Sequence, residues 1–235
     1  MNKPKMIIFD AGKTLFNYHE ADTSRGVREY CRYLTKNPRN LTVEEIDGEV
    51  SGIFETFEAA RKQLFEVHEQ TVLKLAFDLL ELEFSVSIPE IEKIIWENDA
   101  AIVPVTGTKE LLTWLNSAGI RTAVISNLCF SGYLLKERLD WLYPQNRFES
   151  VIASSDYGIR KPERRLFEAG IVHANLKPEE IWYIGDKLAA DVEGAKNCGM
   201  VPVLYKSEFN QYGEISSEVL SVGSYAELKK IMQNL

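Results

Sequence analysis

Hydrophobic positions along the chain follow two different periods. The apolar run Met6-Ile7-Ile8-Phe9 ends on Asp10 and is typical of a short buried strand. Between about residues 21 and 100, apolar residues instead recur at spacings of three and four, which predicts helices. The stretches with this helical pattern are TSRGVREYCRYL, QLFEVHEQTVLKLAFDLLEL and PEIEKIIWENDA. Thr42, followed by Glu45 three residues later, predicts a capping box at the start of another helix in this region.

From Thr106 onward, helical segments alternate with short apolar runs. These runs are RTAVIS, FESVIAS, EIWYIG and VPVLYK, and SYAELKKIMQNL closes the chain as a helix. Strands of this kind, separated by helices, indicate a parallel sheet that is covered on both faces. We therefore predict an α/β fold with a doubly wound parallel sheet, formed by residues 1–17 and 101–235. An α-helical domain, residues 18–100, is inserted into it.

Polar residues follow several of the predicted strands. Ligands of such sheets bind beyond the carboxyl ends of the strands. The residues at these ends are Asp10, Ser126-Asn127, Ser154-Ser155-Asp156 and Gly185-Asp186. Each one alone has an ordinary explanation as a helix cap or turn residue. Their order indicates a site, because Lys161-Pro162 precedes a helix between them and Asp191 follows Asp186 by five residues.

Composition and charge limit the partners. The chain of 235 residues is 45% hydrophobic and 26% charged, as in an ordinary soluble globular protein. Its formal charge of −8 argues against nucleic acid or an anionic membrane as the main partner. The three cysteines show no paired or metal-ligand spacing, and neither a signal-peptide core nor a membrane-spanning segment stands out. We expect a cytoplasmic protein, either a monomer or a homodimer.

The ordered motifs resemble those of the haloacid dehalogenase-like hydrolase superfamily over nearly the whole chain. The matching stretches are FDAGKT, VISN, RKP and IGDKLAAD. The helical insert resembles the four-helix cap, called C1-type, of the largest branch of this superfamily. The resemblance implies a Rossmann-like core with an inserted cap and a hydrolase activity.

The resemblance also assigns roles to residues at the strand ends. It implies that Asp10 is a nucleophile, that Ser126 binds the oxygens of the transferred group, and that Lys161 pairs with Asp10 and the same oxygens. Asn127 would orient the loop of the nucleophile or bind a substrate oxygen. Lys13 would either neutralise a leaving anion at the mouth of the cleft or remain a solvent-facing loop residue. Both alternatives stay open for each of the last two residues.

A metal site is implied as well. Asp10, Asp186 and the backbone carbonyl of Gly12 would bind Mg²⁺, and Asp191 would support them through water or from the outer shell. The chemistry agrees, because a carboxylate that attacks an anionic phosphate needs cations to cancel the repulsion. Mg²⁺ prefers oxygen ligands in an octahedron.

One position departs from the pattern of the superfamily. Typical phosphatases of this group carry a second Asp, a general acid and base, two residues after the nucleophile, where this chain has Gly12. General acid–base help is worth about 10²–10⁴-fold in rate. We therefore expect an Mg²⁺-dependent phosphatase for a small phosphorylated metabolite, with low turnover of alkyl phosphates. We also expect that Phe16, Tyr18 and His19 line the cleft and set its specificity.

Three alternatives remain at this point. A haloacid dehalogenase-like enzyme needs no second acid, because halide leaves as an anion, although that branch works without metal. A phosphonoacetaldehyde hydrolase-like enzyme would use a Schiff-base lysine of the insert, and Lys36, Lys62 and Lys74 are the candidates. A relative that has lost turnover would keep only a ligand-binding role.

Overall fold

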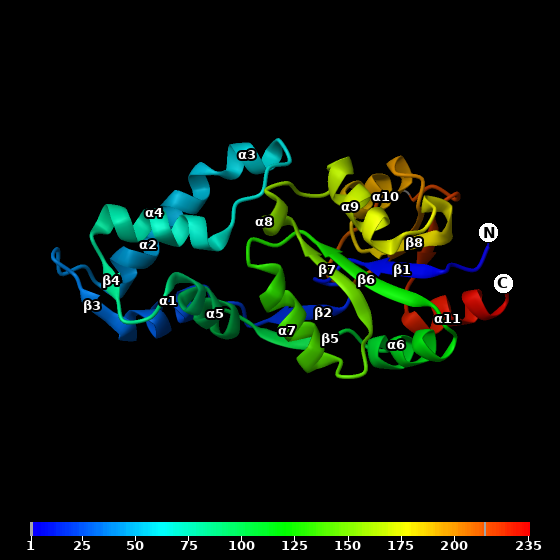
Figure 1. Cartoon of the computed structure of the whole chain (residues 1–235), viewed down its shortest axis with the longest axis horizontal. Coiled ribbons are helices and arrows are strands. Elements are labelled where there is room, and N and C mark those ends of the chain that lie inside the picture. The colour runs from blue at the N-terminus through cyan, green and yellow to red at the C-terminus, as the bar shows by residue number, and fades with distance from the viewer. Residues whose placement is uncertain (1, 214) are drawn as a thin grey trace.

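The computed structural model describes residues 2–213 and 215–235 and shows a parallel sheet as its central element (Figure 1). Within these residues the sheet has six strands, in the order β10-β9-β8-β1-β6-β7. All neighbouring pairs are parallel. The bounds are β1 Met6–Phe9, β6 Arg121–Ser126, β7 Phe148–Ala153, β8 Ile181–Gly185, β9 Val201–Tyr205 and β10 Leu220–Val222. The predicted α/β fold is confirmed, and the short edge strand β10 is an addition that the hydrophobic pattern did not predict.

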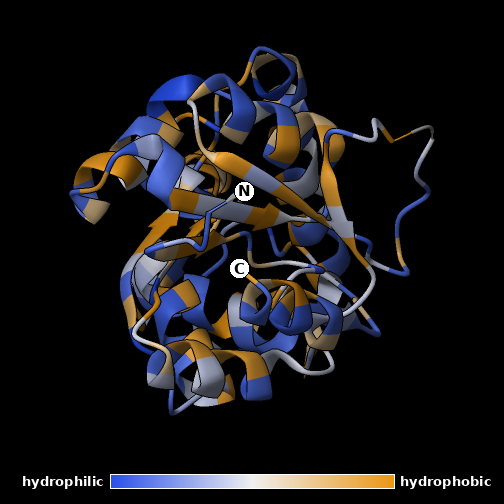
Figure 2. Cartoon of the chain, turned by 90° about the vertical axis from the view of Figure 1, so that its right-hand side faces the viewer, coloured by the Kyte–Doolittle hydropathy of each residue, from blue (hydrophilic) through white to orange (hydrophobic). Residues whose placement is uncertain are grey.

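Helices cover both faces of this sheet because side chains alternate along each strand. Ile7 and Phe9 belong to one buried cluster, which includes apolar residues of α6, α7 and α11. Met6 and Ile8 belong to the other cluster, formed with α9 and α10. Figure 2 shows the largely hydrophobic strands between these two layers. The helices span α6 Thr108–Ser117, α7 Gly132–Leu142, α8 Ser154–Tyr157, α9 Arg164–Ala174, η2 Pro178–Glu180, η3 Leu188–Val192, α10 Glu193–Asn197 and α11 Tyr225–Gln233.

The helical insert forms its own apolar cluster on the side of the carboxyl ends of the strands (Figure 1). Its elements are α1 Ser24–Tyr30, η1 Cys31–Tyr33, β3 Leu34–Lys36, α2 Val43–Thr56, α3 Glu58–Lys62, α4 Glu69–Leu80, β4 Glu83–Phe84 and α5 Ile88–Asn98. The capping box of Thr42 and Glu45 is confirmed at the start of α2. The β3–β4 pair departs from the purely helical pattern that we predicted for this region.

One predicted helix begins later than expected. The pattern indicated a helix from Gln63, but α4 begins at Glu69, after His68 has capped it by accepting a hydrogen bond from the Gln70 amide. Gln63 and Leu64 form a turn instead, with Leu64 at φ 67°, and the Glu66 amide donates to the Gly158 carbonyl over 3.0 Å. A contact with a distant loop therefore replaces the helical hydrogen bonds that local spacing favoured.

An antiparallel ribbon joins the insert to the sheet. Strand β2 (Phe16–His19) pairs with β5 (Ala101–Pro104), so that Tyr18 lies opposite Ile102. The proposed domain boundaries at 17/18 and 100/101 fall at this ribbon, and the division into two domains stays a prediction. None of the helices in the described ranges has the length and apolar character that crossing a membrane requires.

Candidate active site

The site is built around a contact between Asp10 and Lys161. Asp10 follows β1 directly, between the ends of the neighbouring strands β6 and β8. Lys161 lies in the loop between α8 and α9, where its peptide bond to Pro162 is cis. Its Nζ lies 2.6 Å from Asp10 Oδ1, and only 3% of the Lys161 surface is exposed. Residues that are 151 positions apart thus form a buried ion pair at the centre of the sheet's edge.

The buried ammonium of Lys161 has several acceptors. Besides Asp10, it donates to Asp191 Oδ1 over 2.7 Å and to the Tyr183 hydroxyl over 2.8 Å. Its fourth contact is the Ile125 carbonyl at 3.1 Å, which also accepts from the Tyr183 hydroxyl at 2.9 Å. Burial disfavours the charged amine, but the Asp10 and Asp191 carboxylates outweigh it and hold the pKa of Lys161 well above its usual value. The amine is therefore a fixed positive charge.

Tyr183 is a site residue that the sequence did not reveal. It belongs to the apolar strand β8, whose sequence pattern indicates core residues, and only 1% of its surface is exposed. Its hydroxyl nevertheless contacts the Lys161 amine. No local signal distinguishes a core tyrosine from one that orients a charged side chain.

Asn127 positions Lys161 through the backbone. Its Oδ1 accepts from the Lys161 amide over 2.8 Å, and its Nδ2 donates to the Lys161 carbonyl over 3.1 Å. Of the two alternatives for Asn127, the structure shows it holding a loop, although this loop is that of the lysine rather than that of Asp10. Two hydroxyls flank the Asp10 carboxylate: Ser126 Oγ donates to Oδ1 at 3.4 Å and Thr14 Oγ1 donates to Oδ2 at 3.3 Å.

Three buried carboxylates converge at the same place. Asp10, Asp186 and Asp191 each offer an oxygen within 4.8 Å of the others. Burial raises the pKa of Asp10 to about 6; Lys161 opposes that rise, while the neighbouring Asp191 and Asp186 add to it. Burial likewise raises the pKa of Asp186. Such crowding of like charges is unfavourable without a cation.

The donor set fits a hard divalent cation. Asp186 Oδ1 is buried and has no hydrogen-bond partner among the described residues. A β-carbon at Gly185 would lie 2.3 Å from Asp191 Cγ, so only glycine lets the Asp191 carboxylate approach this closely. Carboxylate oxygens in a compact cluster match the preference of Mg²⁺.

The loop after β9 completes the surroundings of Asp186. Asn210 Nδ2 donates to the Asp186 carboxylate and, over 3.0 Å, to its carbonyl. The Tyr212 hydroxyl donates to the same carbonyl at 3.0 Å. Lys13 Nζ donates to Asn210 Oδ1 at 3.3 Å, which ties the first motif to this loop. Neither Asn210 nor Tyr212 was predicted, because the loop is brought to the site only by the sheet.

A narrow cavity of about 130 Å³ opens onto these groups. Its lining consists of Asp10, Gly12, Lys13, Tyr18, Ser126, Asn127, Lys161, Lys187, Ala190 and Asp191. The cavity thus brings together Lys13, Ser126, Asn127 and Lys161, for which the sequence predicted substrate binding. Lys13 adopts the left-handed conformation at φ 61°, which glycine adopts without steric cost.

Tyr18 lies where the second acid of typical phosphatases would project. A β-carbon at Gly12 would be 3.3 Å from Tyr18 Cε2 and 3.8 Å from its hydroxyl oxygen. Of the three residues predicted to line the cleft, only Tyr18 does so. Phe16 is wholly buried in the main apolar cluster, and the exposed His19 packs edge-on against Phe209. Phe16 lies on the same face of β2 as Tyr18, with the two rings edge-on at 5.4 Å, but the core encloses it completely. The prediction is therefore confirmed for Tyr18 and wrong for Phe16 and His19.

Comparison with known proteins identifies the family. A model of the haloacid dehalogenase-like hydrolases matches residues 4–199. The chain belongs to this family. Among curated proteins, a glyceraldehyde 3-phosphate phosphatase of Pyrococcus furiosus is 32% identical over 135 residues, which cover 56% of this chain and 54% of that protein. The chain spans about half the length of the curated relatives it matches.

Solved structures share the fold over the whole chain. A 2-haloacid dehalogenase from Pseudomonas syringae superposes with a TM-score of 0.65 at 17% identity, covering 100% of this chain and 99% of that one. A family phosphatase from Thermococcus onnurineus superposes with a TM-score of 0.55 at 18% identity, covering 99% and 98%. Because one fold carries both reactions, the choice between them depends on the residues of the site.

Proposed function

We propose that this chain is a Mg²⁺-dependent phosphatase that uses Asp10 as its nucleophile. The observation that carries the proposal is the 2.6 Å contact of Lys161 Nζ with Asp10 Oδ1 beside the cluster of Asp186 and Asp191. A fixed ammonium and a cation site next to one carboxylate are what attack on an anionic phosphate requires. Attack on a neutral carbon would not require them.

The proposed reaction has two steps, formation and hydrolysis of an aspartyl-phosphate. The Asp10 carboxylate attacks phosphorus, and the bond from phosphorus to the leaving oxygen breaks as the aspartyl-phosphate forms. Water then attacks this phosphorus and releases inorganic phosphate, which restores the Asp10 carboxylate. Lys161 and Ser126 bind the phosphoryl oxygens, and Asn127 keeps the lysine loop in place.

The metal would be held by the groups that the sequence indicated. Asp10, Asp186 and the Gly12 carbonyl are the proposed ligands, and Asp191 supports them. When bound, Mg²⁺ neutralises charge on the phosphoryl oxygens and orients the group for in-line attack. Asn210 keeps the Asp186 carboxylate in one orientation, since it donates to both the side chain and the carbonyl of that residue.

Tyr18 is the proposed proton donor in place of the missing acid. It lines the catalytic cavity against Gly12, and although 40% of its surface is exposed, desolvation of its hydroxyl and the nearby Asp10 carboxylate raise its pKa above the usual value. The phenol therefore stays protonated and can donate to a departing alkoxide. The phenolate that remains takes a proton from the water of the second step, which restores the phenol. Because a phenol is a weaker acid than the missing carboxylic acid, we expect the first step to limit turnover of alkyl phosphates.

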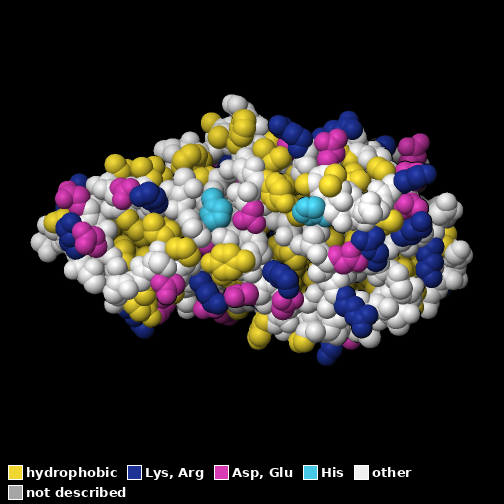
Figure 3. Space-filling view, viewed as in Figure 1, with side chains coloured by type: hydrophobic (Ala, Val, Ile, Leu, Met, Phe, Trp, Pro, Cys, Tyr) yellow, Lys and Arg dark blue, Asp and Glu magenta, His cyan; other side chains and the backbone are white. Residues whose placement is uncertain are grey.

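The substrate is proposed to be a small phosphorylated metabolite. Curated relatives are named glyceraldehyde 3-phosphate phosphatase, which makes that ester the first compound to test. The net charge of −8 and the intermixed acidic and basic side chains on the face in Figure 3 favour a small substrate over nucleic acid. A cytoplasmic location and a monomeric or homodimeric state remain part of the proposal.

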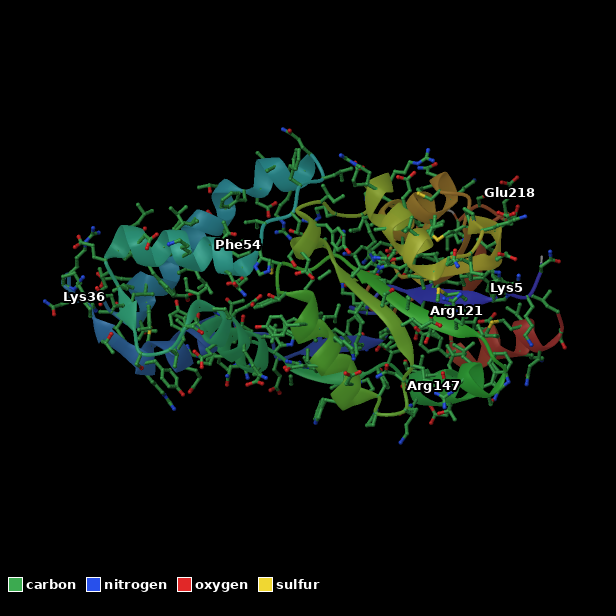
Figure 4. All side chains as sticks on the ribbon, viewed as in Figure 1. Lys5, Lys36, Phe54, Arg121, Arg147 and Glu218 are labelled. Atoms are coloured by element: carbon green, nitrogen blue, oxygen red, sulfur yellow. The ribbon has the colours of Figure 1, made fainter. Side chains whose placement is uncertain are left out.

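The Schiff-base alternative finds no support in the positions of the lysines. Lys36, Lys62 and Lys74 are all exposed, and none lines the catalytic cavity. Lys36 lies at the far end of the insert (Figure 4) and pairs with Glu83 at 2.7 Å. A lysine this far from Asp10 cannot form an adduct with a substrate bound there.

The test measures phosphate release from p-nitrophenyl phosphate, acetyl phosphate and glyceraldehyde 3-phosphate, with Mg²⁺ and with EDTA. We expect Mg²⁺-dependent release that is fastest with the good leaving groups, and none from Asp10→Asn. Halide release from a 2-haloacid in EDTA would favour the dehalogenase alternative. Metal binding without turnover of any ester would leave only a binding role.

A further inference from the structure

A second cavity, of about 330 Å³, lies in the helical insert. It shares no lining residue with the catalytic cavity. Apolar walls come from α1, α2, α5 and the loop after β6, through Val27, Phe54, Ile95 and Phe130. Phe54, labelled in Figure 4, marks the place of this cavity in the insert.

Carboxylates dominate the polar part of its lining. Asp47, Glu69 and Asp99 come from three different helices or helix ends, and Glu69 is only 6% exposed. No lysine or arginine is among the described residues that line the cavity. The charge of Arg25 lowers the pKa of Asp99. The Arg25 Nε atom, however, lies 3.6 Å from Asp22 Oδ2, with which it forms an ion pair.

A buried hydroxyl without a partner faces the same space. Tyr30 lines the cavity and has no exposed surface, and its hydroxyl finds no hydrogen-bond partner in the described residues. The charges of Asp47, Glu69 and Asp99 all act on this hydroxyl. Buried polar groups are normally satisfied, so an unpaired hydroxyl among carboxylates indicates a missing ligand.

We propose that this cavity binds a small organic cation, a primary ammonium on an apolar body. Its N–H groups donate to the Glu69 carboxylate and the Tyr30 hydroxyl oxygen, while its apolar part lies against Phe54 and Phe130. An inorganic cation would not use the apolar walls, and a neutral molecule would not stabilise the ionised form of Glu69.

Protonation of Glu69 supports this assignment. Burial raises the pKa of Glu69 to about 8, with Asp99 and Glu92 adding to the rise and Cys129 opposing it through a hydrogen bond. Burial also raises the pKa of Asp99 to about 7. The empty cavity therefore holds neutral Glu69 at pH 7, and a bound ammonium ionises it. Binding then releases about one proton for each carboxylate that ionises.

The experiment is calorimetric titration of the full chain with benzylamine, and with benzyl alcohol as the neutral counterpart. We expect benzylamine to bind with a proton released at pH 7, detected by comparing buffers of different ionisation enthalpy. Benzyl alcohol should bind at least tenfold more weakly. Glu69→Gln should weaken benzylamine binding at least tenfold and reduce the proton release to what Asp99 contributes, and Tyr30→Phe should weaken binding several-fold. The exposed Glu49→Gln on α2 is the matched control and should leave binding unchanged.

Three results would overturn the proposal. They are equal binding of the amine and the alcohol, undiminished binding by Glu69→Gln, and displacement of benzylamine by orthovanadate, which would place the probe at Asp10. Glutamine resembles the protonated acid in shape, so the Glu69 variant should fold, and its thermal unfolding verifies this. Because these titrations involve no turnover, they are independent of the proposed phosphatase activity.

Discussion

The ring of Tyr18 packs against the backbone of Gly12, at a distance of 3.3 Å from the place of a β-carbon on that glycine. The two residues lie on either side of the turn between β1 and β2, and both line the catalytic cavity. An acidic side chain at Gly12 and the ring at Tyr18 would compete for one space. The absence of the second acid and the presence of the tyrosine are therefore one structural feature.

Replacing Tyr18 by Phe should lower kcat for an ester with a poor leaving group and spare an ester with a good one. We expect kcat to fall about 10²-fold for glyceraldehyde 3-phosphate, the lower end of what proton donation contributes, and to stay within twofold for p-nitrophenyl phosphate, whose leaving group needs no proton. Steady-state kinetics of both esters measures this split. Tyr33→Phe, at an exposed position in the insert, is the control. An equal loss for both esters would show that Tyr18 only packs.

An aspartate in place of Gly12 should raise alkyl phosphate turnover only when the side chain of Tyr18 is made smaller. Gly12→Asp alone should give no gain in alkyl phosphate turnover, because a contact of 3.3 Å forces Tyr18 or the loop to shift. Gly12→Asp combined with Tyr18→Ala should raise that turnover at least tenfold above Tyr18→Ala alone. Gly12→Ala reports the steric effect by itself. A gain in the single variant would mean that the ring moves aside freely.

Removal of the buried ammonium should damage both stability and activity. Lys161→Met leaves the Asp10 and Asp191 carboxylates unpaired, and breaking a buried ion pair costs about 3–5 kcal/mol. Urea unfolding of the metal-free protein measures this loss. Lys136→Met, which removes an exposed pair with Asp140, should cost less than about 1 kcal/mol. Equal costs would show that the ammonium contributes no more than a surface charge.

Mg²⁺ should stabilise the fold through the acidic cluster. Because Asp10, Asp186 and Asp191 crowd within 4.8 Å, we expect Mg²⁺ to raise the Tm of the wild-type chain and EDTA to reverse the effect. Asp186→Asn should lose most of the shift, whereas the exposed Glu218→Gln should keep it. An unchanged shift in Asp186→Asn would place the ion elsewhere. The measurement needs no substrate.

Glu69 should make the empty protein less stable as pH rises. Its pKa is about 8 when folded and about 4.5 when unfolded, so the folded state holds the extra proton between these values. Its contribution is complete below about pH 4.5 and is lost as pH rises to about 8, with a limiting slope of about 1.4 kcal/mol per pH unit. The free energy of unfolding of Glu69→Gln minus that of wild type should therefore increase over this range. A difference that stays constant with pH would show that Glu69 is ionised in the folded protein, with an ordinary pKa.

Local pattern was sufficient for much of the fold. The apolar run at Met6–Phe9 and the alternation after Thr106 predicted a parallel sheet, because continuous apolar strands require cover on both faces. The capping box at Thr42 and Glu45 was equally local, since its partners are three residues apart. The start of α4 could not be predicted in this way, because a hydrogen bond from Glu66 to Gly158 lies outside any sequence window.

The sequence by itself determined which polar residues stand at the strand ends, because the order of strands and motifs fixes that edge. It also determined that a second acid is absent, since Gly12 can be read directly. Only the tertiary structure decided what surrounds them. Tyr183 and Asn210 join the site through side-chain contacts across the sheet, and Tyr18 fills the place beside Gly12 because the β2–β5 ribbon holds it there. Such contacts join residues distant in sequence, and neither period nor spacing encodes them.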